Sequence, residues 1–510
     1  MSTTTYVESS QVVSLEQEAS EVLRLVRSLK NSLAPVNRIP PEVFSLIPNH
    51  YDAHPTDRDL IRSTHVCRSW RETLISRSSL WTHLDFTNVD KTRALIRRSK
   101  SSPLDIHVSD QGRKKYLDHA LSLVFPHIPR LRSLVISAIA IPDILRNFHC
   151  HVPLLENLEI TSPSRNVHTL DIALFGGDLS SLRELRLDGV VTHLPWRNMA
   201  NLRVFSLICP PESKIMINQF LDFFESAPLL HTIDIEDGIP ESSDAPPKRI
   251  VSLRHLKTFA TTADPAYSIL KHLDIPIGAS LDVWTGFSGE APPLLDYLPE
   301  RLPNIKNLSH ITAVNLCFLP EDKYVQLSGP SGSLSLCTPW EDLVIPSSIM
   351  DLRILLSIGP RIFSTTRRLT ISRYPHPNPA NVDESPVFQA LSSTNDLRTL
   401  VLSRCNIRPF IFALDPERNA SKLMLCPNLK EIVLYTGSWG DPEDLVSMVK
   451  TRALMGAKLS SIKLIALRAA APKTEALKLR DYVTQVEYGA KREPPEWDHL
   501  PDESESRVGM

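Results

Sequence analysis

Few residues of this 510-residue chain have the types and spacing that catalysis or metal binding requires. His149-Cys150-His151 is the best metal candidate, because residues 149 and 151 could share one face of an extended chain. No further ligand pair stands nearby in sequence, so a solvated pair of loop histidines is the favoured interpretation. Ser288 and Ser331 stand in segments similar to the G-x-S-x-G nucleophile pattern, but both segments lack its final glycine. Walker and H-E-x-x-H motifs are missing as well, so we predict no catalytic residue, no metal site and no cofactor.

A basic stripe is the clearest charged feature of the chain. It consists of Lys91, Arg93, Arg97, Arg98 and Lys100, and residues 93, 97 and 100 fall on one side of a helix. Such a stripe is usually a solvated helix face, and a charged grip on an acidic partner is the alternative. Lysine plus arginine (56) nearly balances aspartate plus glutamate (58), for a net charge of -2. We therefore expect neither a nucleic acid nor a membrane surface as a partner.

Cysteine usage and the N-terminus indicate the compartment. The seven cysteines stand far apart and form no C-x-x-C pair, which is typical of free thiols in a reducing environment. The first residues lack the charged and then apolar profile of a signal peptide. No segment approaches the roughly 20 apolar residues of a membrane helix. We expect a soluble protein of the cytoplasm, the nucleus or both.

The elements that fill most of the chain begin with one recurring phrase, Leu-x-x-Φ-x-Φ, in which Φ is apolar. Its end has the period of two of a β-strand. Successive leucines in the first half stand 20 to 28 residues apart, within the range of about 20–29 for leucine-rich repeats. The strict copies are Leu131/Leu134/Ile136, Leu155/Leu158/Ile160, Leu182/Leu185/Leu187, Leu202/Phe205/Leu207, Leu230/Ile233/Ile235, Leu397/Leu400/Leu402, Leu429/Ile432/Leu434 and Leu459/Ile462/Leu464. The weaker copies are Leu256/Phe259/Thr261, Leu308/Ile311/Ala313 and Thr366/Leu369/Ile371.

Two wide gaps and the segments between strands complete the pattern. The gaps from 256 to 308 and from 308 to 366 each suit two units, and strands at 281–284 and 334–336 would fill them. Between strands the chain is predicted to be helical, for example at 218–224 and from Asp441 to Gly456. Prolines often stand two residues before the repeat's leucine, where they end the helix and favour extended backbone. They account for part of the unusual proline content, 41 prolines against 16 glycines.

Only the unit from Leu397 to Ile407 resembles the full leucine-rich-repeat consensus. In the standard repeat the residue at the Cys405 position hydrogen-bonds the turning backbone, whereas other units have Ile139 or Val190 there. The resemblance implies an irregular solenoid with a parallel sheet on the concave face and helices outside. A generic α/β domain whose strands begin with leucine is the alternative. The concave residues would be Val135, Glu159, Arg186, Ser206, Asp234, Val401, Val433 and Lys463, with Glu159, Arg186, Asp234 and Lys463 as the candidate target-binding residues.

The N-terminal region is predicted to contain a short amphipathic helix over residues 15–30. Its apolar residues are Leu15, Val22, Leu25 and Leu29, of which 22, 25 and 29 fall on one stripe and 15, 22 and 29 are a heptad apart. Because two heptads are too few for a coiled coil, we expect this helix to pack on its own protein.

Residues 37–86 contain more apolar surface than three short helices can bury. Pro40 and Pro41 fit a first helical turn, and Ile39, Val43 and Ile47 follow on one face. A second helix is expected from Thr56-Asp57-Arg58-Asp59 onward, carrying Leu60, Val66, Cys67 and Trp70. A partner or the following domain has to cover part of this surface.

Three blocks of this region resemble the F-box, the module that docks onto the adaptor Skp1 of cullin-based ubiquitin ligases. The blocks are Ile39-Pro40-Pro41-Glu42-Val43, His65-Val66-Cys67-Arg68-Ser69-Trp70 and Leu80-Trp81, in the family's order. Ile39 replaces the family's leucine, and Pro48-Asn49-His50 replaces the usual apolar end of the first helix. The resemblance implies that Ile39, Pro40, Val43, Ile47, Leu60, Val66, Cys67 and Trp70 contribute to the Skp1-facing surface or to the core behind it. A purely structural role is the expectation for Trp81.

The expected fold is therefore α/β: a three-helix F-box-like module followed by an irregular leucine-rich-repeat solenoid. The predicted limits are 1–34 for the N-terminal region, 35–86 for the module, 87–480 for the solenoid and 481–510 for an acidic disordered tail. By resemblance to a large fungal F-box family, the protein would be a non-catalytic substrate receptor that binds Skp1, through it a cullin, and an unknown target protein. A non-degradative scaffold is the alternative, and an enzyme with an unrecognised site is a third possibility that no residue pattern supports.

Overall fold

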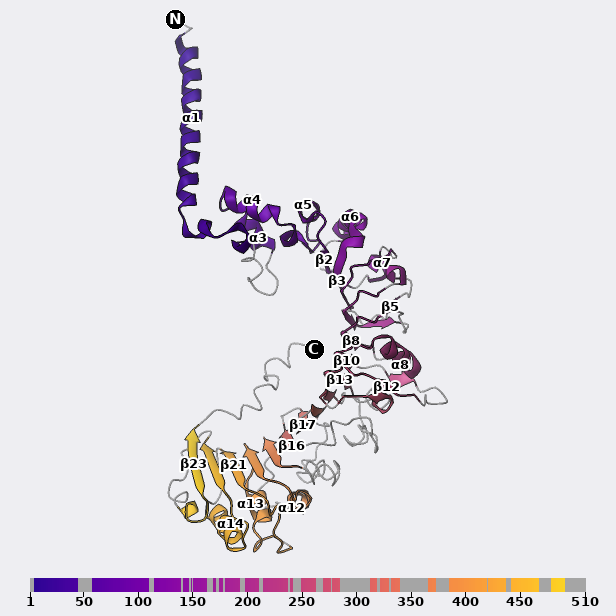
Figure 1. Cartoon of the computed structure of the whole chain (residues 1–510), viewed down its shortest axis with the longest axis vertical. Coiled ribbons are helices and arrows are strands. Elements are labelled where there is room, and N and C mark those ends of the chain that lie inside the picture. Colours follow the sequence, from indigo (N-terminus) through magenta and orange to yellow (C-terminus); the bar gives the residue numbers. More distant parts are fainter. Residues whose placement is uncertain are drawn as a thin grey trace. The chain divides into compact units, whose positions relative to one another are not determined.

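The chain forms two compact units in a computed structural model (Figure 1). Unit 1 comprises residues 1–163 and 173–182, and unit 2 comprises residues 164–172 and 183–510. The structure describes residues 4–44, 57–109, 114–138, 141–145, 148, 150–162, 168–170, 174–177, 179–192, 198–210, 214–236, 239–241, 249–262, 269–276, 278–284, 312–318, 322–329, 332–339, 366–372, 385–419, 421–436, 442–466 and 478–490. The units divide near residues 163–183, whereas the predicted boundary between module and repeats is at residue 86.

Unit 1 combines helices with a short parallel sheet. Its helical elements are α1 (Thr4–Ser32), η1 (Pro35–Arg38), α2 (Pro41–Phe44), α3 (Asp57–Ser63), α4 (Arg68–Ser76), η3 (Ser78–Trp81), α5 (Val89–Ser99), α6 (Lys114–Val124), η4 (Phe125–Arg130), α7 (Ile141–Leu145) and η5 (Leu174–Gly177). Its strands are β1 (His83–Leu84), β2 (Leu104–Ser109), β3 (Leu131–Ser137) and β4 (Asn157–Thr161). They pair in sequence order and all in parallel. Strand β2 was not predicted, because no leucine phrase introduces it.

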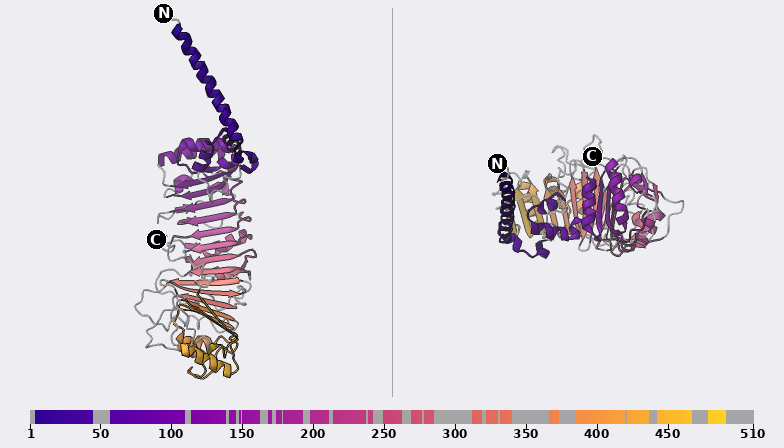
Figure 2. Two further views of the ribbon diagram at one scale, coloured as in Figure 1. Left: turned by 90° about the vertical axis from the view of Figure 1, so that its left-hand side faces the viewer. Right: turned by 90° about the horizontal axis from the view of Figure 1, so that it is seen from above.

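Unit 2 is built on one large sheet, whose strands run side by side from magenta to yellow in Figures 1 and 2. The strands are β6 (Glu184–Asp188), β8 (Val204–Ile208), β10 (Thr232–Glu236), β13 (Thr258–Thr262), β15 (Ser280–Trp284), β16 (Ala313–Phe318), β17 (Asp322–Gly329), β18 (Gly332–Pro339), β19 (Arg368–Ser372), β20 (Thr399–Ser403), β21 (Glu431–Thr436), β22 (Ser461–Ala466) and β23 (Gln485–Ala490). Three small parallel pairs join β5 (His168–Leu170) to β7 (Val190–Thr192), β9 (Lys214–Met216) to β11 (Ile239–Glu241), and β12 (Val251–Ser252) to β14 (Leu273–Asp274). The helical elements are α8 (Ile217–Ser226), η6 (Leu270–His272), α12 (Ser385–Ser392), α13 (Arg408–Leu414) and α14 (Pro442–Leu454).

The strands predicted at the leucine phrases are confirmed, with one departure in their order, except for the copy Leu308/Ile311/Ala313, of which Leu308 and Ile311 lie outside the described residues. Strands β6, β8, β10, β13 and β15 pair successively in parallel, and so do β19 to β23. Between them the order is β15–β18–β17–β16–β19, and β17 is antiparallel to both of its neighbours. The connections from Phe318 to Asp322 and from Gly329 to Gly332 are too short for a parallel crossover, which needs a dozen residues or more, so the chain forms hairpins. The predicted parallel sheet is therefore interrupted in this region by one antiparallel strand.

The apolar face of the sheet is the core of unit 2. Residues of the Φ positions align across strands, as in the row Leu185, Phe205, Ile233 and Phe259, and each of these four is fully buried. Helix α8 supplies Phe220, Phe223 and Phe224 to the same core, with the Phe223 ring centroid 4.5 Å from that of Phe205. Each such side chain contributes about 1.5–3 kcal/mol on burial, so this face holds the sheet together. The architecture is mixed α/β with a large, mostly parallel sheet.

The C-terminal end of the sheet extends into the segment predicted as a disordered tail. Strand β23 pairs in parallel with β22, placing Val486 beside Ile462 and Glu487 beside Lys463. The acidic composition after residue 481 concealed a strand whose alternation of Val486 and Tyr488 is the usual strand signal. Residues 491–510 lie outside the described residues. Among the residues that the structure describes, no helix is both long and apolar enough to cross a membrane.

Candidate partner-binding surfaces

The segment 35–86, here called the docking segment, is held together by Trp70 on α4. The indole Nε1 donates a hydrogen bond to Oδ1 of Asn37 at 2.6 Å, and the Trp70 ring centroid lies 4.6 Å from that of Phe44 on α2. The Asn37 side chain also donates from Nδ2 to the carbonyl of Asn31 at the end of α1, at 2.5 Å. Trp70 therefore fixes α2 and the preceding turn onto α4.

The second predicted helix is in fact two helices, α3 and α4, so the expectation that one helix carries Leu60, Val66, Cys67 and Trp70 is wrong. The Thr64 hydroxyl bonds back to the Ile61 carbonyl at 2.7 Å, which favours a break. The freed Thr64 carbonyl then accepts from Arg71 Nε at 2.9 Å. Cys67, at φ -156° and ψ 171°, is the extended residue that begins α4. Val66 and Cys67 consequently lie on the connection between the helices.

Seven of the eight residues predicted to face Skp1 are described, and they divide into three groups by burial. Leu60 is buried together with Phe44, Leu74 and Trp81, and forms the local core. Ile39, Cys67 and Trp70 are half-buried. Pro40 is exposed, and so are Val43 and Val66, which expose 52% and 60% of their surface. Ile47 lies outside the described residues, as does the segment Pro48-Asn49-His50.

Trp81 is a structural residue, as predicted. Its side chain is 1% exposed, and its Nε1 donates to the Leu74 carbonyl at 2.9 Å, which ties the C-terminal end of α4 to η3. The guanidinium of Arg98 on α5 lies 4.4 Å above the ring, a cation–π contact. Burial against the ring lowers the pKa of Arg98.

The basic stripe on α5 is partly neutralised by its own neighbours. Lys91 Nζ lies 2.7 Å from Asp85 Oδ2, and Arg93 Nη1 lies 2.7 Å from Asp90 Oδ1. Burial alone would raise the pKa of Asp85, but the hydrogen bond and charge of Lys91 outweigh it and the pKa is lowered. Of the five basic residues, three therefore already have a partner in the chain, counting Arg98 on Trp81. This favours the interpretation as a solvated helix face.

The second candidate surface is the polar face of the sheet of unit 2, opposite its apolar core. The predicted concave residues lie on one row across adjacent strands, because the register pairs Arg186 with Ser206 and Ser206 with Asp234. The same row continues through Ala260 to Asp282 on β15. Towards the other end it runs through Val401 and Val433 to Lys463 and Glu487. In unit 1, Val135 and Glu159 are paired in the same manner.

Accessibility divides this polar row into two open stretches. Arg186 is exposed, and Asp234 and Asp282 are half-buried, so β6 to β15 offer one stretch that is open except at Ser206, which exposes 8% of its surface. Lys463 is half-buried and Glu487 is exposed, which gives a second stretch at β22 and β23. Between them Asn315, Thr370, Val401 and Val433 expose 8%, 0%, 1% and 7% of their surface. Val401 and Val433 therefore lie in the predicted row but are buried, so they offer no accessible surface for a partner.

Charges in the open stretches interact across strands. Partial burial raises the pKa of Asp234, although Ser206 Oγ donates to its Oδ2 at 3.4 Å. Lys463 Nζ lies 2.9 Å from Glu431 Oε1, and this hydrogen bond raises the pKa of Lys463. Such half-exposed pairs contribute about 0–1 kcal/mol to stability. Their arrangement therefore determines the charge pattern of the surface more than the stability of the fold.

Two residues of the polar row were missed in the sequence. Asp282 occupies the x position of the predicted strand at 281–284, so applying the repeat pattern there would have found it. Glu487 occupies the x position of β23, where acidic composition suggested disorder. Both have side chains on the face that the pattern assigned to partner binding.

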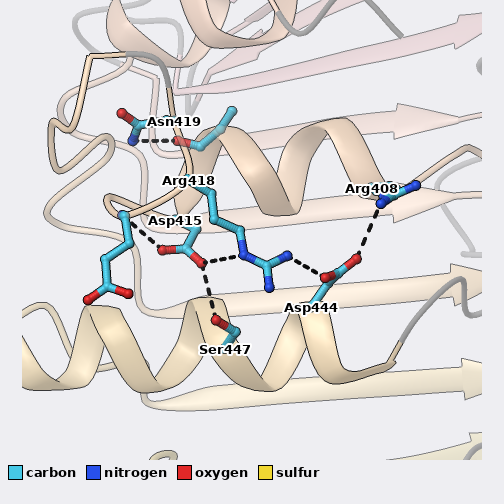
Figure 3. A network of polar contacts seen from close by, with 8 residues as sticks. Arg408, Asp415, Arg418, Asn419, Asp444 and Ser447 are labelled. Atoms are coloured by element: carbon cyan, nitrogen blue, oxygen red, sulfur yellow. Dashed lines mark hydrogen bonds and ion pairs between the residues drawn. The ribbon is translucent and has the colours of Figure 1, made fainter. Parts of the chain in front are cut away.

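The densest cluster of charged side chains lies between α13 and α14 and is a structural network (Figure 3). Arg418 forms an ion pair with Asp444, and its Nε lies 3.7 Å from Oδ2 of the buried Asp415. Ser447 donates to Asp415 at 3.5 Å, and Arg408 lies 3.6 Å from Asp444. The carboxylates of Asp415 and Asp444 both have partners within the chain, so the network joins α13 and α14.

The metal candidate is only partly within the described residues. His149 lies outside them, and Cys150 is an exposed free thiol. Among the described residues, no group of three or more histidine, cysteine or acidic side chains could hold a metal ion.

The chain was also compared with known proteins. No model of a protein family matches it, and a search of curated proteins finds no similar sequence. The function has to be inferred from the residues and surfaces of the chain itself.

Proposed function

We propose that this protein is the substrate-recognition subunit of an SCF-type (Skp1–cullin–F-box) E3 ubiquitin ligase. The docking segment would bind Skp1, and the polar row of the sheet would bind the target protein. The sheet and its outer helices would be an irregular leucine-rich-repeat solenoid. The chain would hold target and ligase together and leave the chemistry to other subunits, so its contribution would be proximity.

The observation that carries the proposal is the exposure of Val43 and Val66 within the F-box-like blocks. Leu60, Phe44 and Leu74 in the same segment are buried, so the segment has a core of its own. The two valines remain 52% and 60% exposed. Apolar residues left exposed beside a formed core are typical of a surface that binds a protein partner.

The target-binding part of the proposal depends on the composition of the polar row. Arg186, Asp234, Asp282, Lys463 and Glu487 combine both signs of charge across strands of one sheet. Mixed charges spread over many strands suit a protein ligand, because each strand adds one contact along an extended surface. No single small molecule would contact residues from β6 to β15 at once.

The test is binding of Skp1 by the full chain, measured by co-purification and by calorimetry. Val43→Asp combined with Val66→Asp should weaken binding about tenfold or more, since each places a charge in an apolar interface. Ile250→Asp is the matched control, because Ile250 is 55% exposed in unit 2 and lies outside the docking segment. Failure of the unaltered, folded protein to bind Skp1 would refute the proposal. If Skp1 binds but the complex does not recruit a cullin, the protein is a non-degradative scaffold instead.

A further inference from the structure

Helix α1 is a long helix whose described apolar side chains are exposed. It spans 29 residues, and in Figures 1 and 2 no described element of unit 1 packs along its length. Every described residue from 11 to 32 is exposed. Leu15, Val22 and Leu29 expose 63%, 58% and 66% of their surface. The expectation that this helix packs on its own protein is therefore wrong.

The apolar side chains of α1 form a coiled-coil seam. The helix extends well beyond the predicted residues 15–30, so the heptad pattern covers three heptads. The a positions are Val12, Ala19 and Val26 within α1 and Leu33 directly after its last residue, and the d positions are Leu15, Val22 and Leu29. A spacing of alternately three and four residues keeps one stripe facing a second helix that coils around the first. A single helix of this kind gains little stability in water, because helices depend on packing of their apolar face.

Charge along the seam, residues 12–33, is divided between its two halves. Glu16, Glu18 and Glu21 stand before the midpoint of these residues, and Arg24, Arg27 and Lys30 stand after it. A second copy in the same direction would place like charges side by side. A second copy in the opposite direction places the acidic half of each helix beside the basic half of the other, so α1 is complementary to itself when reversed.

From the seam and the charges together we propose that the α1 helices of two copies of this chain pair as an antiparallel coiled coil. The register that satisfies both places Leu15 of one copy against Leu33 of the other, Ala19 against Leu29, and Val22 against Val26. Glu16 then flanks Lys30 of the other helix. The two-fold axis passes near Arg24, and the flanking Leu23 and Leu25 each meet their own counterpart there. This accounts for the exposure of Leu23 and Leu25, at 56% and 60%, beside the seam.

Pairing through α1 acts directly on the docking segment. The Asn31 carbonyl near the end of α1 accepts from Asn37, and Asn37 accepts from Trp70. A dimer would therefore hold two docking segments at opposite ends of one coiled coil. The pairing itself does not depend on what the docking segment binds.

The first test is the mass of the full chain in sedimentation equilibrium without any partner. At about 50 μM, in the range where moderate interfaces associate, the expected mass is twice that of one chain. Val22→Glu with Val26→Glu should weaken association about tenfold or more, because charges would face each other in the seam. Gln17→Glu with Ser20→Glu adds the same charge on the opposite side of α1 and should leave the mass unchanged. A wild-type protein that remains monomeric at about 100 μM, or a control that dissociates equally, overturns the proposal.

A second test distinguishes the antiparallel arrangement from a parallel one. Glu16→Lys alone should weaken association a few-fold at low salt, since it would face Lys30 of the other copy. Adding Lys30→Glu restores the pair and should restore association. In a parallel pair residues 16 and 30 do not meet, so absence of rescue contradicts the proposed direction. Skp1 binding is measured separately, so failure of dimerisation and failure of the proposed function are distinguishable.

Discussion

The docking segment and the sheet of unit 2 differ in how far their apolar side chains are buried. In the sheet, the row Leu185, Phe205, Ile233 and Phe259 is fully buried, and the accessible face is polar. In the docking segment, Val43 and Val66 remain about half exposed beside a small core. The sheet has thus satisfied its apolar surface within the chain, so it can recognise a partner only through polar contacts. The docking segment leaves part of its apolar surface exposed, so we expect its partner to contribute apolar surface to the interface.

The largest expected difference between the two regions is in stability. Leu207→Ala in the fully buried face should lower the free energy of unfolding of unit 2 by about 2–5 kcal/mol, because it leaves a cavity. Val66→Ala should change stability by about 0.5 kcal/mol or less, since the side chain is exposed. Chemical denaturation, monitored in each unit by hydrogen exchange, measures the two changes in the free energy of unfolding. Equal losses of stability in the two variants would contradict the difference in burial between the sheet and the docking segment.

Substitution of the buried Arg452 on α14 should have the next largest effect on stability. It is fully buried and donates to the carbonyls of Leu414, Leu425 and Cys426, at 3.3, 2.8 and 2.8 Å. Arg452→Met leaves these acceptors without their donor, and we expect a loss of about 2–3 kcal/mol in the free energy of unfolding. Arg97→Met on the exposed side of α5 is the control and should change stability little. If Arg452→Met leaves the free energy of unfolding unchanged, the guanidinium is not needed for stability.

The pH dependence of stability should show the effect of the buried His272. Burial lowers its pKa, and its Nε2 has no hydrogen-bond partner within the chain. Because the folded pKa lies below the unfolded one, the unfolded chain binds the proton more tightly. Stability should therefore be greatest above the unfolded pKa of about 6.5 and fall as the pH decreases below it. His272→Gln should flatten this decrease, measured by denaturation between pH 7.5 and 5.5, whereas exposed His119→Gln should not. An unchanged slope in His272→Gln would contradict the assignment.

The smallest expected effect is a difference in maleimide reactivity between buried and accessible thiols. Burial raises the pKa of Cys405 to about 12 and that of Cys426 to about 11. Neither should form thiolate at pH 8, and both should resist maleimide in the native protein. Cys150 is exposed and should react rapidly. Peptide mapping after brief labelling measures this, and early modification of Cys405 would show that the core around β20 opens readily.

The sequence predicted the strands well because each has a strong local signal. A leucine followed by two alternating apolar residues places the inward side chains, and helix α14 was predicted from Pro442 and its acidic first turn. The hairpins at β16 to β18 were not predicted, because their formation depends on connection length and pairing across strands. The burial of Val401 and Val433 likewise does not follow from the repeat pattern, which places them in the same row as exposed residues. The break at Thr64 depends on a side-chain hydrogen bond that apolar periodicity does not reveal.

The candidate site was predicted in part. The motif blocks contained both core and surface residues, and only the structure separates Leu60 from Val43 and Val66. The sequence also did not reveal the role of Asn37, which bridges α1 and Trp70 through two hydrogen bonds. An asparagine in a turn has many possible partners, so its sequence context could not identify these two.

The most direct test of the proposed function is hydrogen exchange of the full chain with and without saturating Skp1. We expect new protection in peptides that contain Val43 and Val66, and no change along the polar row from Arg186 to Asp282. Protection should be lost when Val43→Asp and Val66→Asp are combined and retained in Ile250→Asp. Unchanged exchange of the docking segment in a folded protein, or protection confined to the sheet, would contradict the assignment of this segment as the Skp1-binding surface.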